Sequence, residues 1–101
     1  MLNYSAVRLP TQEWERIVRL GAEKHSQELT NELADVRAQV AMFERKYGVS
    51  FAQLQGVGLP DNAGLEAHED YVEWSSWEGR AVELKEKLLR LRMMAGAAYA
   101  G

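Results

Sequence analysis

Large apolar residues recur in two stretches of the chain, with spacings that alternate between three and four residues. The first stretch lies within residues 29–47 and the second within residues 74–91. This alternation places the large side chains on one narrow stripe of an α-helix, which is typical of the seam of a coiled coil or bundle. We therefore predict an all-α fold in which two long helices pack through these stripes. The predicted seam residues are Leu29, Leu33, Val36, Val40, Phe43, Tyr47, Trp74, Trp77, Ala81, Leu84, Leu88 and Leu91.

Helix-breaking residues separate the two stretches and mark the ends of the predicted helices. Pro10 disfavours helix at the residue before it, and Thr11 can cap the helix that follows. Gly48 comes directly after Arg45 and Lys46, which suit the negative end of a helix. We predict a single domain over residues 1–101, with an extended arm at 1–10, a first helix at 11–47, a loop with a short helical turn at 48–64, a second helix at 65–93 and a flexible tail at 94–101.

The first predicted helix contains one candidate interruption. Trp14, Ile17 and Val18 continue an apolar face toward its start, which favours one uninterrupted helix. Gly21 weakens that helix by about 1 kcal/mol relative to alanine, and Ser26 could cap a second helix. A break between these two residues is the alternative interpretation.

The charges of the two predicted helices favour antiparallel packing. The second helix begins with acidic residues and ends with basic ones, which also suits its dipole. Antiparallel packing places Arg45 and Lys46 near the acidic start. It also places the basic end beside Glu23, Glu28 and Glu32. Each exposed ion pair contributes only about 0–1 kcal/mol, so these charges select the orientation more than they stabilise it. We therefore expect a long antiparallel helical hairpin that resembles a coiled coil.

A second apolar strip on the later helix exceeds what a simple hairpin needs. Val72, Val82 and Leu89 belong to this strip, which lies apart from the predicted seam. A wide apolar face argues for a second contact surface, and a homodimer that forms a four-helix bundle would cover it. The candidate partner surface combines this strip with the neighbouring acidic run: Glu66, Glu69, Asp70, Glu73, Val72, Val82 and Leu89.

Two tryptophans on the predicted seam allow two interpretations. Trp74 and Trp77 could form a hot spot for a protein partner, because tryptophan dominates the energetics of many interfaces. The favoured interpretation is a bulky core at the end of the hairpin near the loop, where they would pack on Tyr47 and Phe51.

The titratable residues do not match a catalytic or metal-binding pattern. Metal sites in helical bundles usually set glutamate and histidine three residues apart, but Ala22 and Leu65 stand three residues before His25 and His68. The acidic run is therefore interpreted as a solvated face, and mimicry of nucleic acid toward a basic partner is the alternative. The chain has no cysteine, and no hydrolytic or phosphate-binding motif is present. We expect a protein that is not an enzyme and needs no metal or cofactor.

Composition and charge narrow the expected environment. The net charge of −3 is mild and does not suggest a nucleic-acid coat or binding to an anionic membrane. No apolar run approaches the roughly 20 residues that a membrane-spanning helix needs. The first residues also lack the layout of a secretory signal. We expect a cytoplasmic protein without a membrane partner, and we expect its small core to favour self-association.

The start of the chain resembles the start of ribbon-helix-helix DNA-binding proteins. The likeness rests on residues 7–10, VRLP, followed by an amphipathic helix, and on Ser26, Glu28 and Leu29 at the start of a second helix. In that family, paired strands of a dimer enter the major groove of DNA. Thr30 stands where a second apolar residue is expected. The resemblance implies a DNA-binding dimer that uses residues 4–9.

The middle of the chain resembles small prokaryotic helical-hairpin proteins. The likeness rests on residues 44–51, ERKYGVSF, and on residues 69–74, EDYVEW. It covers residues 40–92, with Val49 in place of the usual methionine and with Ala52 and Gln53 in place of acidic residues. Some of these proteins are encoded beside toxin genes as presumed antitoxins, so the resemblance implies a protein partner that is encoded nearby.

Three functions follow from these observations. The first is a protein–protein interaction module without enzymatic activity, and its most specific form is an antitoxin-like protein that neutralises a toxin. The second is a structural coiled-coil protein whose extra apolar strips serve only its own oligomer. The third is a DNA-binding dimer that acts through the arm at residues 1–10.

Overall fold

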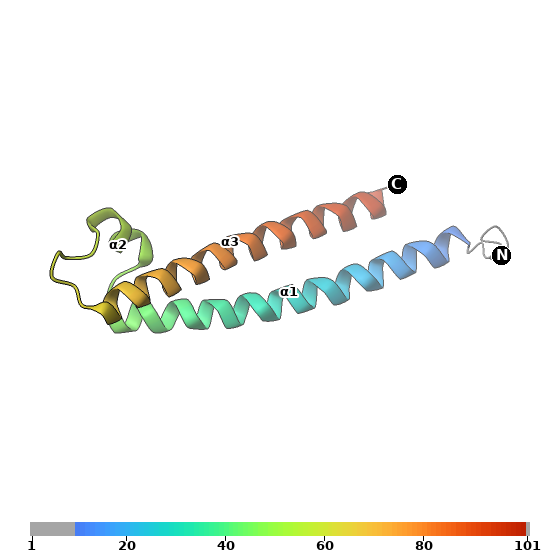
Figure 1. Ribbon diagram of the computed structural model, residues 1–101. Coiled ribbons are helices and arrows are strands. Elements are labelled where there is room, and N and C mark those ends of the chain that lie inside the picture. Colours follow the sequence, from blue (N-terminus) through green and yellow to red (C-terminus); the bar gives the residue numbers. More distant parts are fainter. Residues whose placement is uncertain (1–9, 101) are drawn as a thin grey trace, which may run out of the picture.

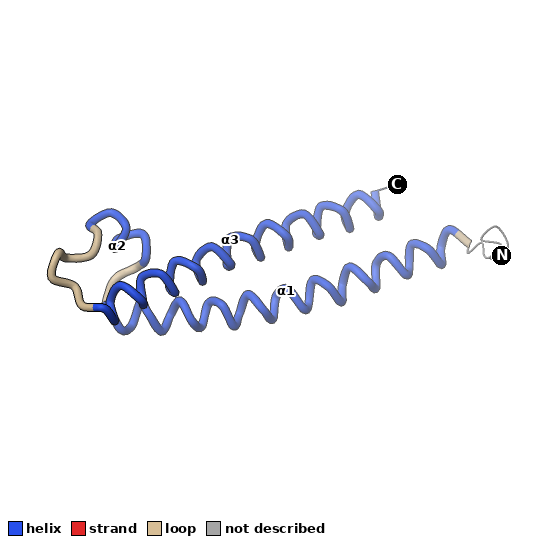
Figure 2. The backbone as a smooth tube through the Cα atoms, viewed as in Figure 1, coloured by secondary structure: helices blue, strands red, loops and turns tan. Residues whose placement is uncertain are grey.

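The computed structural model of the chain describes residues 10–100, which form three helices. These are α1 (Thr11–Tyr47), α2 (Phe51–Val57) and α3 (Leu65–Ala100). Figure 1 shows α1 and α3 side by side and running in opposite directions, with α2 and the two loops at one end. The described residues contain no strand, as Figure 2 shows, so the predicted all-α class is confirmed. We call the end that carries α2 the closed end, and the opposite end the open end.

The molecule is long and thin. Its principal extents are 69 × 34 × 18 Å and its radius of gyration is 21.1 Å. A globular chain of this length would have a radius of gyration of about 13 Å. Two helices that lie side by side therefore account for most of the molecule, and no third layer covers their outer faces within residues 10–100.

Helix α1 is a single helix. It passes through Gly21 and Ser26 without interruption, so the alternative of a break there is wrong. Pro10 occupies the N-cap position, and its carbonyl accepts hydrogen bonds from the backbone N–H groups of Glu13 and Trp14 at 2.9 and 3.1 Å. No side chain caps this end, so the expected capping role of Thr11 is not found. The rest of the predicted arm lies outside the described residues.

The turn after α1 is built by one glycine and one capping box. Gly48 adopts a left-handed conformation with φ of 71°, and its N–H donates to the carbonyl of Glu44 at 2.7 Å. Glycine reaches this conformation without the steric penalty that a Cβ atom brings. Ser50 then starts α2, because its hydroxyl accepts from the N–H of Gln53 while the side chain of Gln53 accepts from the N–H of Ser50.

Helix α3 is longer than the sequence pattern predicts. It continues to Ala100, although the pattern predicts an end at residue 93 and a flexible tail from residue 94. Residues 95–100 contain four alanines, and alanine has the highest helix propensity of all residues. The apolar periodicity stops before this segment, but the backbone preference for helix does not.

The core is a single row of side chains between α1 and α3, and it divides into two clusters. Near the closed end, Trp74 is fully buried among aromatic side chains. Farther along, Leu84 is fully buried in a cluster of aliphatic side chains that reaches Leu29 and Leu91. The two helices draw apart toward the termini (Figure 1). The members of the aliphatic cluster are Leu29, Leu33, Val36, Ala81, Leu84 and Leu88, with Trp77 and Leu91 packed against them.

We predict that Leu84→Ala destabilises the protein strongly. The leucine side chain is fully buried, so its removal should lower the free energy of unfolding by about 2–5 kcal/mol. Leu20→Ala is the matched control, because half of the Leu20 surface is exposed and such a substitution changes stability by about 0.5 kcal/mol or less. Urea denaturation followed by circular dichroism at one protein concentration measures both. Equal effects would contradict the assignment of the core.

We predict opposite effects for alanine at two glycines. A Cβ atom at Gly48 or Gly21 would meet no neighbouring atom within 4 Å, so backbone conformation alone decides the outcome. Gly48→Ala should destabilise by about 1–2 kcal/mol, because an L-residue resists the left-handed conformation. Gly21→Ala should stabilise by about 0.5–1 kcal/mol, because alanine favours the helix. Thermal and urea denaturation would give the two signs, and a stable Gly48→Ala variant would argue against the turn.

Candidate functional site

All predicted seam residues lie between α1 and α3. Each of them belongs to one of the two clusters or packs against it. Phe43 and Trp74 form the closed-end cluster together with Phe51 from α2, and Leu54 packs on its edge. The seam side chains are therefore occupied by contacts within the chain. They are not available to a partner unless the helices separate.

Trp74 is the centre of the closed-end cluster. Its indole stacks on Phe43 and Tyr47, with ring centroids 5.6 and 5.9 Å away, and meets Phe51 at a tilted angle with centroids 5.3 Å away. Trp74 is therefore a core residue, which is the favoured interpretation from the sequence. Trp77 is half-buried and contacts both clusters. The indole nitrogens of Trp74 and Trp77 are buried without a hydrogen-bond partner among the described residues. Each such group costs about 1–3 kcal/mol of stability.

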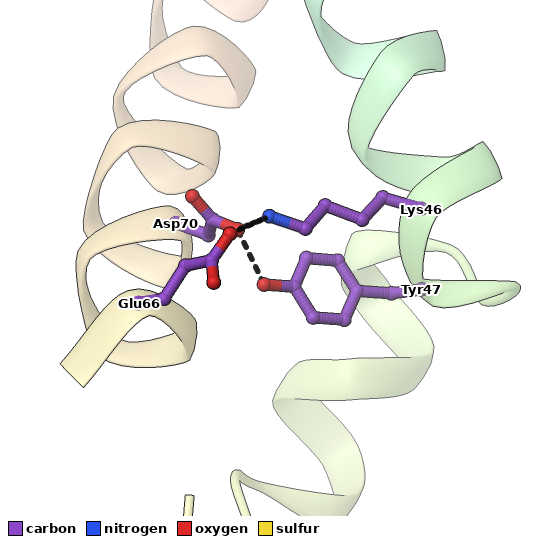
Figure 3. Close-up of polar contacts among 4 residues, drawn as sticks. All are labelled: Lys46, Tyr47, Glu66 and Asp70. Carbon is purple, nitrogen blue, oxygen red and sulfur yellow. Dashed lines mark hydrogen bonds and ion pairs between the residues drawn. The ribbon is translucent and has the colours of Figure 1, made fainter. Parts of the chain in front are cut away.

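A polar network joins α1 to α3 at the closed end, outside the aromatic cluster. Lys46 Nζ donates to Glu66 Oε1 and to Asp70 Oδ2, both at 2.6 Å. Tyr47 donates its hydroxyl hydrogen to the same oxygen of Asp70 at 2.5 Å. Figure 3 shows the four side chains converging between the end of α1 and the start of α3. Residues that are far apart in the sequence are thereby fixed in one register.

The network shifts the protonation equilibria of its members. Hydrogen bonds from Lys46 and then from Tyr47 lower the pKa of Asp70 below its ordinary value of 3.8. Hydrogen bonds to Asp70 and then to Glu66 raise the pKa of Lys46. Burial, and then the hydrogen bond to Asp70, raise the pKa of Tyr47. Each shift favours the hydrogen-bonded form, so these groups hold the helices together and none is poised to transfer a proton near neutral pH.

A second ion pair joins the helices near their middle. Arg80 of α3 donates from Nε to Glu32 of α1 at 2.6 Å and from Nη1 to Glu83 at 3.0 Å. These contacts raise the pKa of Arg80, mainly through Glu32. The expected charge pairing is thus found for Lys46 at one end and for Glu32 in the middle. Glu28 instead pairs with His25 on its own helix, at 3.6 Å.

The structure divides the predicted partner surface into two parts. Glu66 and Asp70 are engaged by Lys46, and the side chain of Asp70 is only 16% exposed. Glu69 and Glu73 are exposed and form no ion pair among the described residues. Part of the acidic run therefore holds α1 and α3 together.

The apolar part of the predicted partner surface is exposed to solvent. We call it the outer strip of α3, and its large side chains are between 53% and 75% exposed. Gly79 lies in the middle of the strip, where a Cβ atom would meet open space. Large apolar side chains that gather on one side of a helix form a candidate interaction surface. The residues of the outer strip are Leu65, Val72, Gly79, Val82, Leu89 and Met93.

Two shallow hollows border the outer strip. The first, which we call the Val72 hollow, has a volume of about 570 Å³ and lies beside Trp77 and Ser76 on α3. Its rim includes Glu69 and Glu73. The second has a volume of about 380 Å³ and lies between α2 and α3, beside Gly79 and Val82 of the strip. The strip is thus an uneven surface that side chains of a partner can enter.

A second exposed patch lies at the start of α1, and the sequence interpretation missed it. Trp14, Ile17, Val18 and Leu20 are between 48% and 52% exposed. Trp14 and Val18 continue the helix face of Leu29, as expected, whereas Ile17 and Leu20 lie on other sides of the helix. All four remain half exposed because they precede the aliphatic cluster, in the part of the molecule where α1 and α3 draw apart (Figure 1). The apolar spacing alone does not reveal where α3 stops covering α1. We call these four residues the α1 patch.

Comparison with protein-family models, with curated proteins and with solved structures finds no match to this chain. Within residues 10–100, no group of three His, Cys, Asp or Glu side chains has an arrangement that could hold a metal ion. In the described part of the chain, no helix is both long enough and apolar enough to cross a membrane.

We predict that the hydrogen bonds from Lys46 and Tyr47 to Asp70 make the stability of the protein decrease in acid. A carboxylate with a lowered folded-state pKa stabilises the folded state above its ordinary pKa and loses that contribution as the pH falls through the lowered value. The free energy of unfolding should therefore decrease below about pH 4. Asp70→Asn should reduce this decrease, whereas Asp61→Asn, in the exposed loop before α3, should retain it. Urea denaturation across the acid range tests both variants. The same dependence of the free energy of unfolding on pH for Asp70→Asn and for wild type would contradict a stabilising role for these hydrogen bonds.

Proposed function

We propose that this chain is a protein–protein interaction module without enzymatic activity. One observation carries the proposal, namely that the described surface presents large apolar side chains on two ordered helical faces. These faces are the outer strip of α3 and the α1 patch. Single exposed apolar residues are ordinary, but contiguous patches on a helix are typical of protein-binding sites.

The polar residues support a binding role over a catalytic one. The most strongly coupled titratable groups, Lys46, Tyr47 and Asp70, satisfy one another across the α1–α3 junction. Their pKa shifts stabilise the charge states that hold the helices together. A catalytic acid or base needs a pKa near the operating pH and access to substrate. The arrangement of these three residues serves structure.

The α1 patch is the better candidate for a different protein. It contains Trp14, the residue type most enriched in binding hot spots, together with Ile17, Val18 and Leu20. It lies beyond the aliphatic cluster, so a partner can bind it without opening the core. The likeness of residues 44–51 and 69–74 to presumed antitoxins supports a partner encoded by a neighbouring gene. An antitoxin-like neutraliser is therefore the specific form of the proposal.

Self-association accounts for the other exposed face. The outer strip of α3 offers apolar surface that the α1–α3 pair does not cover, and a symmetric dimer buries such a surface on both copies at once. A homodimer, which the sequence suggested in the form of a four-helix bundle, is part of the proposed function. The DNA-binding alternative depends on residues 4–9, which lie outside the described residues.

We predict that Ile17→Glu abolishes partner binding and leaves the fold intact. The chain would be co-expressed with the product of each adjacent gene, and the complex isolated and titrated by calorimetry. A charge in the α1 patch should weaken the complex at least about tenfold, as for loss of a hot-spot contact. Val57→Glu, at the most exposed apolar residue outside both faces, should bind like wild type.

The control for folding is circular dichroism, which should show the same helix content and melting temperature for both variants. If no adjacent product forms a complex, and none loses toxicity in the presence of this chain, the antitoxin-like form fails. If Ile17→Glu and Val57→Glu bind alike, the α1 patch is not the site.

A further inference from the structure

The outer strip of α3 faces away from α1. Successive residues of a helix are rotated by about 100°, so the strip lies roughly 150° around the helix axis from the seam that contains Ala81 and Leu84. A helix that docks on the strip would therefore lie on the far side of α3. The α1 patch lies on the other long helix and is not part of the strip.

The charges beside the outer strip change sign along α3. Glu69 and Glu78 lie beside its first half, and Lys85 and Arg90 lie beside its second half. None of these four forms an ion pair among the described residues. A second α3 docked in parallel would place like charges together, whereas an antiparallel one places acidic residues opposite basic ones. For a second copy of the chain on the strip, charge complementarity therefore favours the antiparallel orientation.

We propose that two copies of this chain pair through the outer strips of their α3 helices, antiparallel about a twofold axis that passes between Arg80 and Ala81. This proposal rests on the proposed self-association and adds the orientation and the register. In this register, Val72 of one copy lies against Leu89 of the second copy. Gly79 lies against Val82 of the second copy, and the absence of a side chain at Gly79 lets the helices approach closely at the centre.

The same register pairs the charges on both edges of the strip. On one edge, Glu69 lies opposite Arg90 of the second copy, and on the other edge Glu78 lies opposite Lys85 of the second copy. The twofold axis repeats each pair, so four ion pairs flank one apolar strip. A single apolar spacing and two independent charge pairs thus agree on one register, which is the signature of a self-complementary surface.

The hollows beside the strip suit this arrangement. The lining of the Val72 hollow includes Val72 and Trp77 together with Glu69 and Glu73. Leu89 of the second copy would contact the apolar part of this lining, and the neighbouring Arg90 would lie near its carboxylates. The four helices of the dimer then form a row, with the two α3 helices in the middle. This arrangement differs from a bundle around one central core.

Disulfide trapping tests the register, and the chain suits it because it has no cysteine. Val72→Cys and Leu89→Cys would be purified separately, mixed in equal amounts and oxidised mildly. The proposal expects abundant cross-linked heterodimer in the mixture and little cross-linking of either variant alone. In this register, two copies of residue 72 are separated by about 25 Å along the axis, and a disulfide needs Cα atoms within about 7 Å. Asn31→Cys mixed with Leu89→Cys, with Asn31 exposed on α1, is the matched control.

A charge swap provides a second measurement. Glu69→Arg should weaken the dimer about tenfold by placing like charges together, and the double variant Glu69→Arg/Arg90→Glu should restore it. Sedimentation equilibrium measures both. A monomeric wild type, or cross-linking of Val72→Cys alone that equals the mixture, would overturn the antiparallel α3 pairing. Binding of an adjacent gene product through the α1 patch would be unaffected by that result, so the two proposals fail separately.

Discussion

The burial of Trp74 fixes how α1 and α3 are placed along each other. Its indole is enclosed by the rings of Phe43, Tyr47 and Phe51, and a shift of α3 by one helical turn, about 5.4 Å, would take it out of this enclosure. The contacts of Asp70 with α1 depend on the same placement. The rotation of α3 is fixed with it, and the outer strip consequently points away from α1.

Two helices cannot enclose their own apolar residues, because each covers only one side of the other. The core is therefore one row of side chains, and much of the remaining apolar surface is exposed. A chain of this size gains little stability from such a core. The outer strip and the α1 patch are parts of the surface that this arrangement leaves uncovered.

The sequence predicts the seam well, because alternating spacings depend only on local helix geometry. The first residue of α1 is predicted correctly, but the exposure of the apolar residues near it is not, because that exposure depends on where α3 stops covering α1. The exposure of Val72, Val82 and Leu89 follows from their place on α3. Charge order predicts that Lys46 lies near the acidic start of α3, but the hydrogen bond from Tyr47 to Asp70 depends on the rotation of the packed helices.

The aromatic cluster also sets an order of assembly along the molecule. The network at the closed end joins residues 23 positions apart, from Tyr47 to Asp70, whereas Glu32 and Arg80 are 48 positions apart. The entropy lost on loop closure grows with the length of the loop. The helices should therefore pair first at the closed end and last at the open end. Their open ends then fray first. The α1 patch lies on that last-formed segment, so its part of the helix should open locally more often than the part in the seam.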